Sequence, residues 1–180
     1  MKKIAAILGL ITLVAFQSCE GPMGPIGPEG PQGPQGQPGV NITSEVFQVD
    51  VDFTEANNFE QIFEFNPRIQ ANDVVLAFIR WDTSGQNPIW RALPQTIFFN
   101  EGVLIYNYDF TRDDFKLFLD GPIDYRTLGA EWTRGQRFRV VVVPGEFAGS
   151  RIDWTNYEDV VKLLGIEEQD FLNSEIALSK

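Results

Sequence analysis

The chain combines marked acidity with a complete lack of histidine. It has 180 residues, of which 25 are acidic and 14 basic, for a formal net charge of −11. A charge of this sign disfavours polyanionic partners, so we expect no nucleic acid and no anionic membrane surface bound through charge. Without histidine, Ser-His-Asp and Cys-His catalytic pairs and His-ligated zinc or iron sites cannot form, and we expect no metal and no cofactor.

The first 18 residues have the pattern of an export signal. Lys2 and Lys3 precede an apolar run from Ile4 to Phe16, which is shorter than the about 20 residues needed to span a bilayer. We expect cleavage before Cys19, the sole cysteine, and acylation of its sulfur, because a single thiol in an exported chain has no disulfide partner of its own. The alternative is an ordinary secretory signal followed by an incidental thiol. Cleavage removes two lysines and no acid, so the formal charge becomes −13.

Residues 19–40 join the lipidated cysteine to a collagen-like repeat. Glycine recurs at every third position, and proline fills one of the two positions between successive glycines. Only glycine fits at the axis of a collagen triple helix, and proline preorganises each strand, so the pattern predicts a stalk in which three copies associate. The axial glycines are Gly21, Gly24, Gly27, Gly30, Gly33, Gly36 and Gly39.

The shortness of this repeat bears on its assembly. Six triplets form a short triple helix, which we expect to need either a trimeric head or lipid anchors that concentrate the chains in one plane. A stiff Pro/Gly spacer that does not associate is the alternative. Either form would extend about 60 Å at roughly 3.1 Å per residue and hold the next domain away from the membrane.

Residues 41–168 change to an aromatic and β-branched composition that predicts one β-rich head. Apolar residues alternate with polar ones from Phe47 to Phe53, which is typical of a strand with one buried face, and Pro94 interrupts a longer segment at an expected edge or bulge. The expected strands are 47–53, 59–65, 74–81, 89–99, 103–110, 115–119 and 136–143. Short strands with closely spaced turns favour an all-β, antiparallel β-sandwich, of which a jelly roll is one form.

One short C-terminal helix is expected near the end of the head. Thr155 and Glu158 have the spacing of a capping box, and Gly165 can end the helix. Beyond it, a polar and loosely ordered tail is expected at 169–180.

Carboxylate chemistry is the enzymatic alternative that remains without histidine. The evident acidic pairs are Asp50 with Asp52 and Asp113 with Asp114, which could serve a glycosidase-like mechanism or bind calcium. Neither pair has the spacing of a calcium-binding loop, and acidic side chains are usually solvated. We therefore expect a protein that is not an enzyme and has no catalytic residues.

Tryptophans offer a second kind of site, because flat rings can stack on sugars while neighbouring polar groups bind the hydroxyls. Trp81, and Trp90 with Arg91, are the candidate glycan-binding residues. Aromatic side chains also dominate cores and interfaces, so we expect most of the four tryptophans to be packing residues or trimer contacts.

The whole chain resembles the small collagen-like lipoproteins of Bacteroidota. The matching features are the lysine-led signal, the relaxed lipoprotein box Phe16-Gln17-Ser18-Cys19, the Gly-Pro triplets, and the head segments at 90–96 and 118–121. The layout of stalk and β-head is also similar to that of the C1q and tumour-necrosis-factor-like proteins, in architecture alone. The resemblance implies an anchored envelope protein and supplies no site residues.

These features predict a protein of the bacterial cell envelope, anchored through its lipid, at the outer membrane. It would display its head on a collagen-like, trimeric stalk for structural or adhesive contact. Its expected partners are the membrane, two further copies of the chain, and a glycan or another envelope protein. The alternative is a glycan-binding module of a surface uptake system.

Overall fold

A computed structural model describes residues 44–84, 87–147, 149–172 and 176–178 of the chain. The expected signal peptide, Cys19 and the seven axial glycines lie outside these residues, as does the boundary at residue 40. Within the described ranges, none of the helices has the length and apolar character to cross a membrane.

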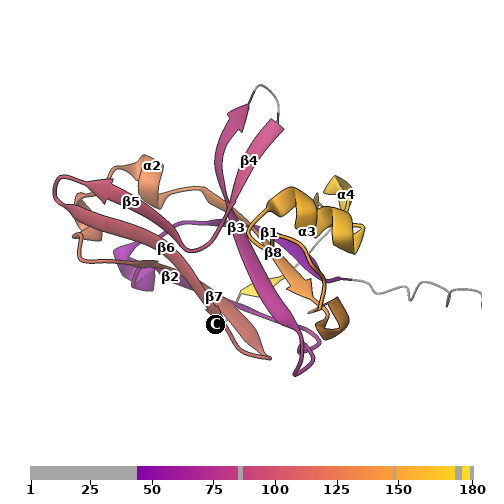
Figure 1. Ribbon diagram of the computed structural model, residues 1–180. Coiled ribbons are helices and arrows are strands. Elements are labelled where there is room, and N and C mark those ends of the chain that lie inside the picture. Colours follow the sequence, from indigo (N-terminus) through magenta and orange to yellow (C-terminus); the bar gives the residue numbers. More distant parts are fainter. Residues whose placement is uncertain (1–43, 85–86, 148, 173–175, 179–180) are drawn as a thin grey trace, which may run out of the picture. The chain divides into compact units, whose positions relative to one another are not determined.

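Two antiparallel sheets make up the head (Figure 1). The first sheet has the order β1-β8-β3-β4 and the second β5-β6-β7-β2-β9. The first contains β1 (Val46–Val51), β8 (Gln136–Val143), β3 (Val74–Ser84) and β4 (Asn87–Ala92). The second contains β5 (Gln95–Phe99), β6 (Gly102–Phe110), β7 (Asp114–Asp120), β2 (Glu60–Glu64) and β9 (Ala177–Leu178). The predicted all-β, antiparallel class is confirmed.

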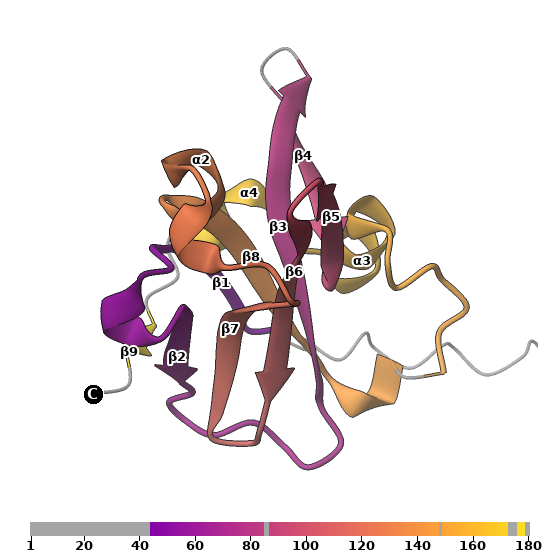
Figure 2. The same ribbon diagram turned by 90° about the vertical axis from the view of Figure 1, so that its left-hand side faces the viewer.

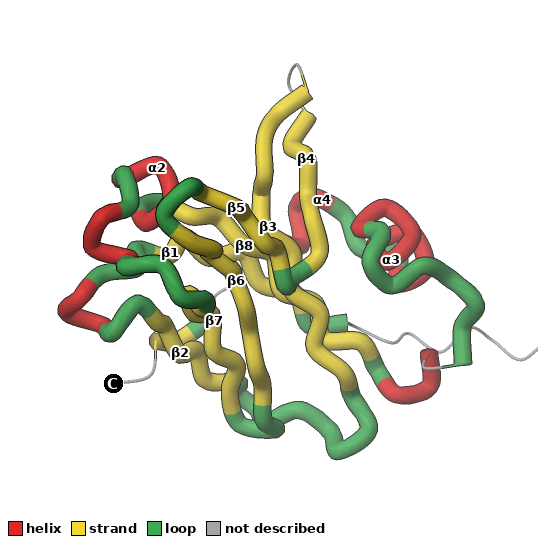
Figure 3. The backbone as a smooth tube through the Cα atoms, turned by 60° about the vertical axis from the view of Figure 1, so that its left-hand side comes forward, coloured by secondary structure: helices red, strands yellow, loops and turns green. Residues whose placement is uncertain are grey.

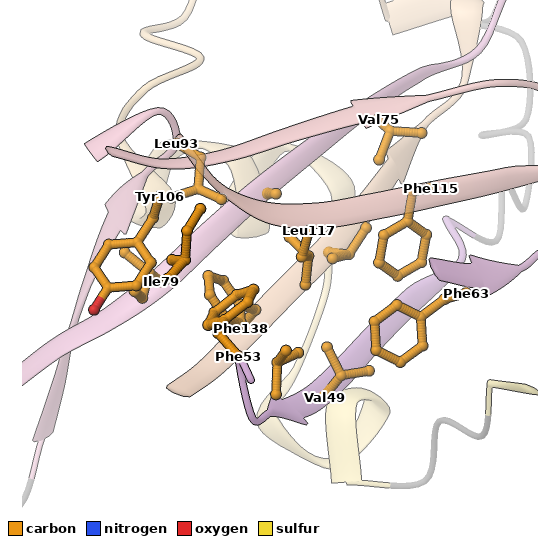
Figure 4. Packing of buried hydrophobic residues seen from close by; sticks show 14 of the residues in the cluster. Val49, Phe53, Phe63, Val75, Ile79, Leu93, Tyr106, Phe115, Leu117 and Phe138 are labelled. Atoms are coloured by element: carbon orange, nitrogen blue, oxygen red, sulfur yellow. The ribbon is translucent and has the colours of Figure 1, made fainter. Parts of the chain in front are cut away.

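The main core lies between the two sheets (Figure 4). Because side chains alternate along a strand, Val49 and Ile79 point from the first sheet into this core. There they join Phe63, Phe115 and other buried residues of the second sheet. The Phe63 and Phe115 rings stack with centroids 5.0 Å apart. The period-two pattern that predicts the strands therefore also determines which side chains meet in the core.

Pro94 separates two strands where the sequence predicts a single interrupted segment at 89–99. β4 ends at Ala92 in the first sheet, and β5 begins at Gln95 in the second, so the chain changes sheets at Leu93-Pro94 (Figure 2). The backbone N–H of Leu93 donates to the carbonyl of Ala77 at 2.9 Å, which is the last contact with β3 before the crossing. Both strands lie at sheet edges, where proline is tolerated.

Two short helices cover the outer face of the first sheet (Figure 3). α3 (Tyr157–Leu164) and α4 (Glu168–Leu172) pack Val160 and Phe171 against Phe78 and Val141 of that face. The remaining helices are α2 (Ala130–Thr133) and the single 3₁₀ turns Glu55–Asn57, Tyr125–Thr127 and Gly145–Phe147. The prediction of a sandwich with one helix is therefore incomplete. The first sheet is packed between the second sheet and a layer formed by α3 and α4.

The C-terminal region differs from the sequence expectation in two respects. The N-cap of α3 is Asn156, whose side chain accepts from the N–H groups of the first turn, rather than Thr155; Gly165 ends the helix in the left-handed conformation, with φ of 65°. The expected polar tail at 169–180 instead contributes α4, with Phe171 only 2% exposed, and β9, which pairs with β2. The sequence does not predict α4 and β9 because apolar residues are few here. Phe171 and β9 also make their contacts with residues that are distant in the sequence.

Arg139 in β8 connects the first sheet to helices α3 and α4 through several contacts. Its side chain is 2% exposed, and the guanidinium lies over the rings of Phe171 and Trp90, at 4.2 and 4.3 Å from their centroids. It donates hydrogen bonds to the side chains of Gln48, Tyr157 and Glu168. Because the Glu168 side chain is 63% exposed, packing and hydrogen bonds contribute more here than the ion pair.

Replacing Arg139 tests this role. Arg139→Ala should lower the free energy of unfolding by about 2–4 kcal/mol, because it empties a packed space and removes the partner of Tyr157. Arg137→Ala, two residues along the same strand, removes an exposed ion pair and should cost less than about 1 kcal/mol. Urea denaturation followed by circular dichroism measures both. Equal losses would contradict the assigned role.

Candidate functional site

Strands β3 and β4 continue past the rest of the first sheet as a two-stranded ribbon. β3 pairs with β8 from Val74 to Ile79, whereas its pairing with β4 runs on to Ser84, so the ribbon stands away from the sheets at the top of Figure 1. The register shifts between Arg80 and Asp82, which leaves Trp81 as the extra residue of a bulge. Bulges re-aim side chains, and this one lies at the foot of the ribbon.

A polar cleft of about 420 Å³ opens beside this bulge. It lies between β3, the short helix α2 and the start of β8. Its lining residues are Arg80, Trp81, Asp82, Glu131, Arg134, Gly135, Gln136 and Arg137. Three arginines and two acids line the cleft, so its local charge is opposite to that of the acidic chain as a whole.

The turn that carries α2 into β8 is held by hydrogen bonds within the turn and to Asp52. Gly135 has φ of 57°, a left-handed conformation that strains other residues, and its N–H donates to the Asp52 carboxylate at 2.7 Å. The Gln136 amide donates to the carbonyls of Glu131 and Arg134, both at 2.9 Å. This wall of the cleft is thus held by hydrogen bonds within residues 131–136 and by one to Asp52, which follows β1.

Arg137 forms the shortest ion pair at the cleft. Its guanidinium donates two hydrogen bonds to the Asp50 carboxylate, each 2.7 Å long, in a bidentate arrangement across β1 and β8. The hydrogen bond from Arg137 holds the pKa of Asp50 below its ordinary value, partly offset by burial, with a further contribution from the charge of Arg80. Arg80 itself is exposed and makes no ion pair within 4.0 Å among the described residues.

Two of the three candidate glycan-binding residues, Trp81 and Arg91, contact each other. The Arg91 guanidinium lies 4.4 Å from the centroid of the Trp81 ring. Arg91 is exposed, whereas Trp81 is half-buried and packs against the main core. Trp81 therefore presents a supported, partly accessible ring at the edge of the polar cleft.

Trp90, the third candidate, lies on the opposite face of the ribbon. Successive residues of a strand point to opposite faces, so Trp90 and Arg91 cannot form one site despite being neighbours in sequence. Trp90 packs against Tyr157, with ring centroids 5.6 Å apart, and against the guanidinium of Arg139. It also borders a separate cleft of about 490 Å³ between the ribbon and the start of α3.

The acidic pairs proposed for carboxylate chemistry are each engaged in local structure. Asp50 binds Arg137, while Asp52 accepts from Gly135 and lies 3.6 Å from Arg134. Asp113 pairs with Arg68 at 3.0 Å. Asp114 accepts from the hydroxyl of Thr111 at 2.7 Å. These contacts give all four carboxylates structural roles.

Sequence reasoning missed most of the cleft. Arg80, Glu131, Arg134, Gln136 and Arg137 come from segments about 50 residues apart, and only strand pairing brings them together. One sequence pattern could have indicated part of it. Arg137 and Arg139 lie in a largely apolar strand, and charged side chains near a core need ionic or hydrogen-bonding partners.

The Asp50–Arg137 pair should make the free energy of unfolding depend on pH in the acidic range. Since the folded-state pKa of Asp50 is lowered, its contribution is fully present above the unfolded value of about 4 and disappears as pH falls through the folded value. Asp50→Asn should therefore lower the free energy of unfolding by up to about 1 kcal/mol at pH 7. The difference should vanish in strong acid. Urea denaturation across this pH range measures it, and a difference that persists in acid would contradict the assignment.

Comparison with known proteins does not extend these observations. No protein-family model matches the chain, and neither a curated protein nor a solved structure does. The function must therefore be inferred from the side chains and their geometry. Within the described residues, no group of three or more acidic or cysteine side chains is placed to hold a metal ion.

Proposed function

We propose that this chain is a lipid-anchored protein of the bacterial cell envelope that presents its head on a collagen-like stalk for adhesive contact. Cys19 would carry the lipid and the outer membrane would hold it. The proposal includes membership of the small collagen-like lipoproteins of Bacteroidota and a jelly-roll-like head. In the head, the pairings β1–β8 and β2–β7 bring early and late strands together as in a jelly roll, whereas β3–β4, β5–β6 and β6–β7 pair as sequential hairpins.

The polar cleft at the foot of the ribbon carries the adhesive part of the proposal. It combines a supported aromatic ring, Trp81, with guanidinium groups that can bind hydroxyl, carboxylate or sulfate oxygens. Arg80 and Arg91 are exposed and so remain accessible to a partner. Asp50, Asp52, Asp113 and Asp114, the acids that the sequence suggests for hydrolysis, instead form structural contacts.

A second candidate is a glycan-binding module that serves a surface uptake system. The contact between Trp81 and Arg91 favours it, since a sugar ring can stack on an indole while guanidinium groups bind its substituents. This candidate uses the same cleft and differs in its ligand, a soluble oligosaccharide rather than a surface.

Lipid anchoring can be tested at Cys19. Cys19→Ser removes the sulfur that would be acylated, so the protein should leave the membrane fraction and lose incorporation of labelled fatty acid. Fractionation of cells that express each form measures this. Ser18→Ala, next to the cysteine, should leave both properties unchanged. Equal membrane association of both variants would contradict the proposed anchor.

Cleft binding can be tested with a glycan array and the full-length mature protein. Saturable binding is expected, and Arg80→Ala should weaken it by about tenfold, equivalent to about 1.4 kcal/mol, through loss of a charge-assisted hydrogen bond. Trp81→Phe should also weaken binding, because a smaller ring offers less stacking area.

Arg68→Ala provides the matched control, since it removes an exposed arginine on a remote loop. It should leave binding unchanged. Trp90→Phe alters the other cleft and should have little effect. Loss of binding in Trp90→Phe alone would move the contact to that second cleft and contradict the assignment to the first.

A further inference from the structure

The outer face of the second sheet carries an apolar stripe that neither core uses. Ile62, Val103, Ile105 and Phe118 are half-buried, and Phe98 is 79% exposed. All five lie outside both buried clusters of the described residues. They alternate along their strands with inward residues such as Leu104 and Leu117, so their side chains point outward.

Strand register makes these residues contiguous. Phe98 of β5 lies opposite Val103 of β6, and Ile105 follows Val103 on the same face. Phe118 of β7 lies opposite Asn107, which places it diagonally beside Ile105. Ile62 of β2 pairs with Lys116 and so continues the stripe past Phe118. The stripe thus crosses four neighbouring strands.

Polar residues border the stripe at one end. Lys116 lies 3.3 Å from Asp109 and 3.7 Å from Glu60, and its ammonium group lies over the ring of Phe118. In Figure 1, helices α3 and α4 lie on the far side of the first sheet, away from this face. An apolar centre with a paired, polar border is the composition of an interface between protein chains.

We propose that this stripe is where neighbouring copies of the head meet in a trimer. The inference rests on the proposed collagen-like stalk, which requires three copies and is too short to hold them firmly by itself. The last axial glycine, Gly39, precedes Ser44, the first described residue, by five residues, or about 17 Å of extended chain. Three heads tethered this closely to one axis are held within reach of each other at high effective concentration.

Charge limits which face can serve as the contact between copies. Acidic heads repel one another, so contact requires a surface with little unpaired charge. The five stripe residues are uncharged; beside them Lys116 pairs with both Asp109 and Glu60, and Asp120, opposite Ile105, adds a further negative charge. By contrast, the polar cleft beside Trp81 would place guanidinium groups in a buried interface, and it stays open to a partner when the opposite sheet is covered.

The test is the oligomeric state of the full-length mature protein, extracted in detergent and measured by analytical ultracentrifugation. Wild type should sediment as a trimer. The double variant Phe98→Thr/Ile105→Thr keeps β-forming side chains but removes apolar area, and its protein mass should fall to about one third at the same concentration. Thermal unfolding by circular dichroism checks that it remains folded.

A matched double variant, Val74→Thr/Phe110→Thr, removes two other exposed apolar residues, which are 43% and 39% exposed and lie outside the stripe. It should remain trimeric. A wild-type trimer that persists in both variants would overturn the stripe as an interface while leaving the trimeric stalk intact. A wild-type monomer at every concentration would overturn both, and the lipid anchor would be judged separately by the Cys19 experiment.

Discussion

The burial of β8 on both of its faces is the constraint on which the head depends. Phe138, Val140 and Val142 face the second sheet, while Arg139, Val141 and Val143 face the helical layer. A strand covered on both sides needs apolar residues in both registers, and β8 supplies them except at Arg139. That one cation is accommodated because Trp90 and Phe171 cover it and Gln48, Tyr157 and Glu168 accept its hydrogen bonds. The contacts of Arg139 thus connect β1, β4, α3 and α4 to one central strand.

The same strand positions the candidate binding site. β8 begins with Gln136 and Arg137, which extend beyond its doubly covered part and line the polar cleft. β3, its neighbour, continues past it as the ribbon that supplies Arg80 and Trp81. The cleft therefore forms where a two-sheet domain ends and a single ribbon continues, and its side chains are supported by the core on one side only.

The two outward surfaces of the head have different chemistry and can serve different contacts. The foot of the ribbon presents guanidinium groups and one indole ring, which suit a polar or acidic partner. The outer face of the second sheet presents an apolar stripe beside the ion pairs of Lys116 with Asp109 and Glu60, which suits another folded chain. Self-association through one surface would leave the other free, and three copies would multiply the avidity of a weak individual contact.

The sequence by itself determined the all-β class, most strand positions and the helix before Gly165, because strand alternation and helix capping are local patterns. It also predicts lipid attachment at Cys19 and a collagen-like stalk, both in residues outside those that the structure describes. Only the tertiary structure decided that Trp90 faces away from Arg91, that the polar tail adds α4 and β9, and that residues 80–82 and 131–137 meet in a cleft. These outcomes depend on contacts between residues tens of positions apart. The register of β3 against β8 and β4 brings them together, and no local pattern specifies that register.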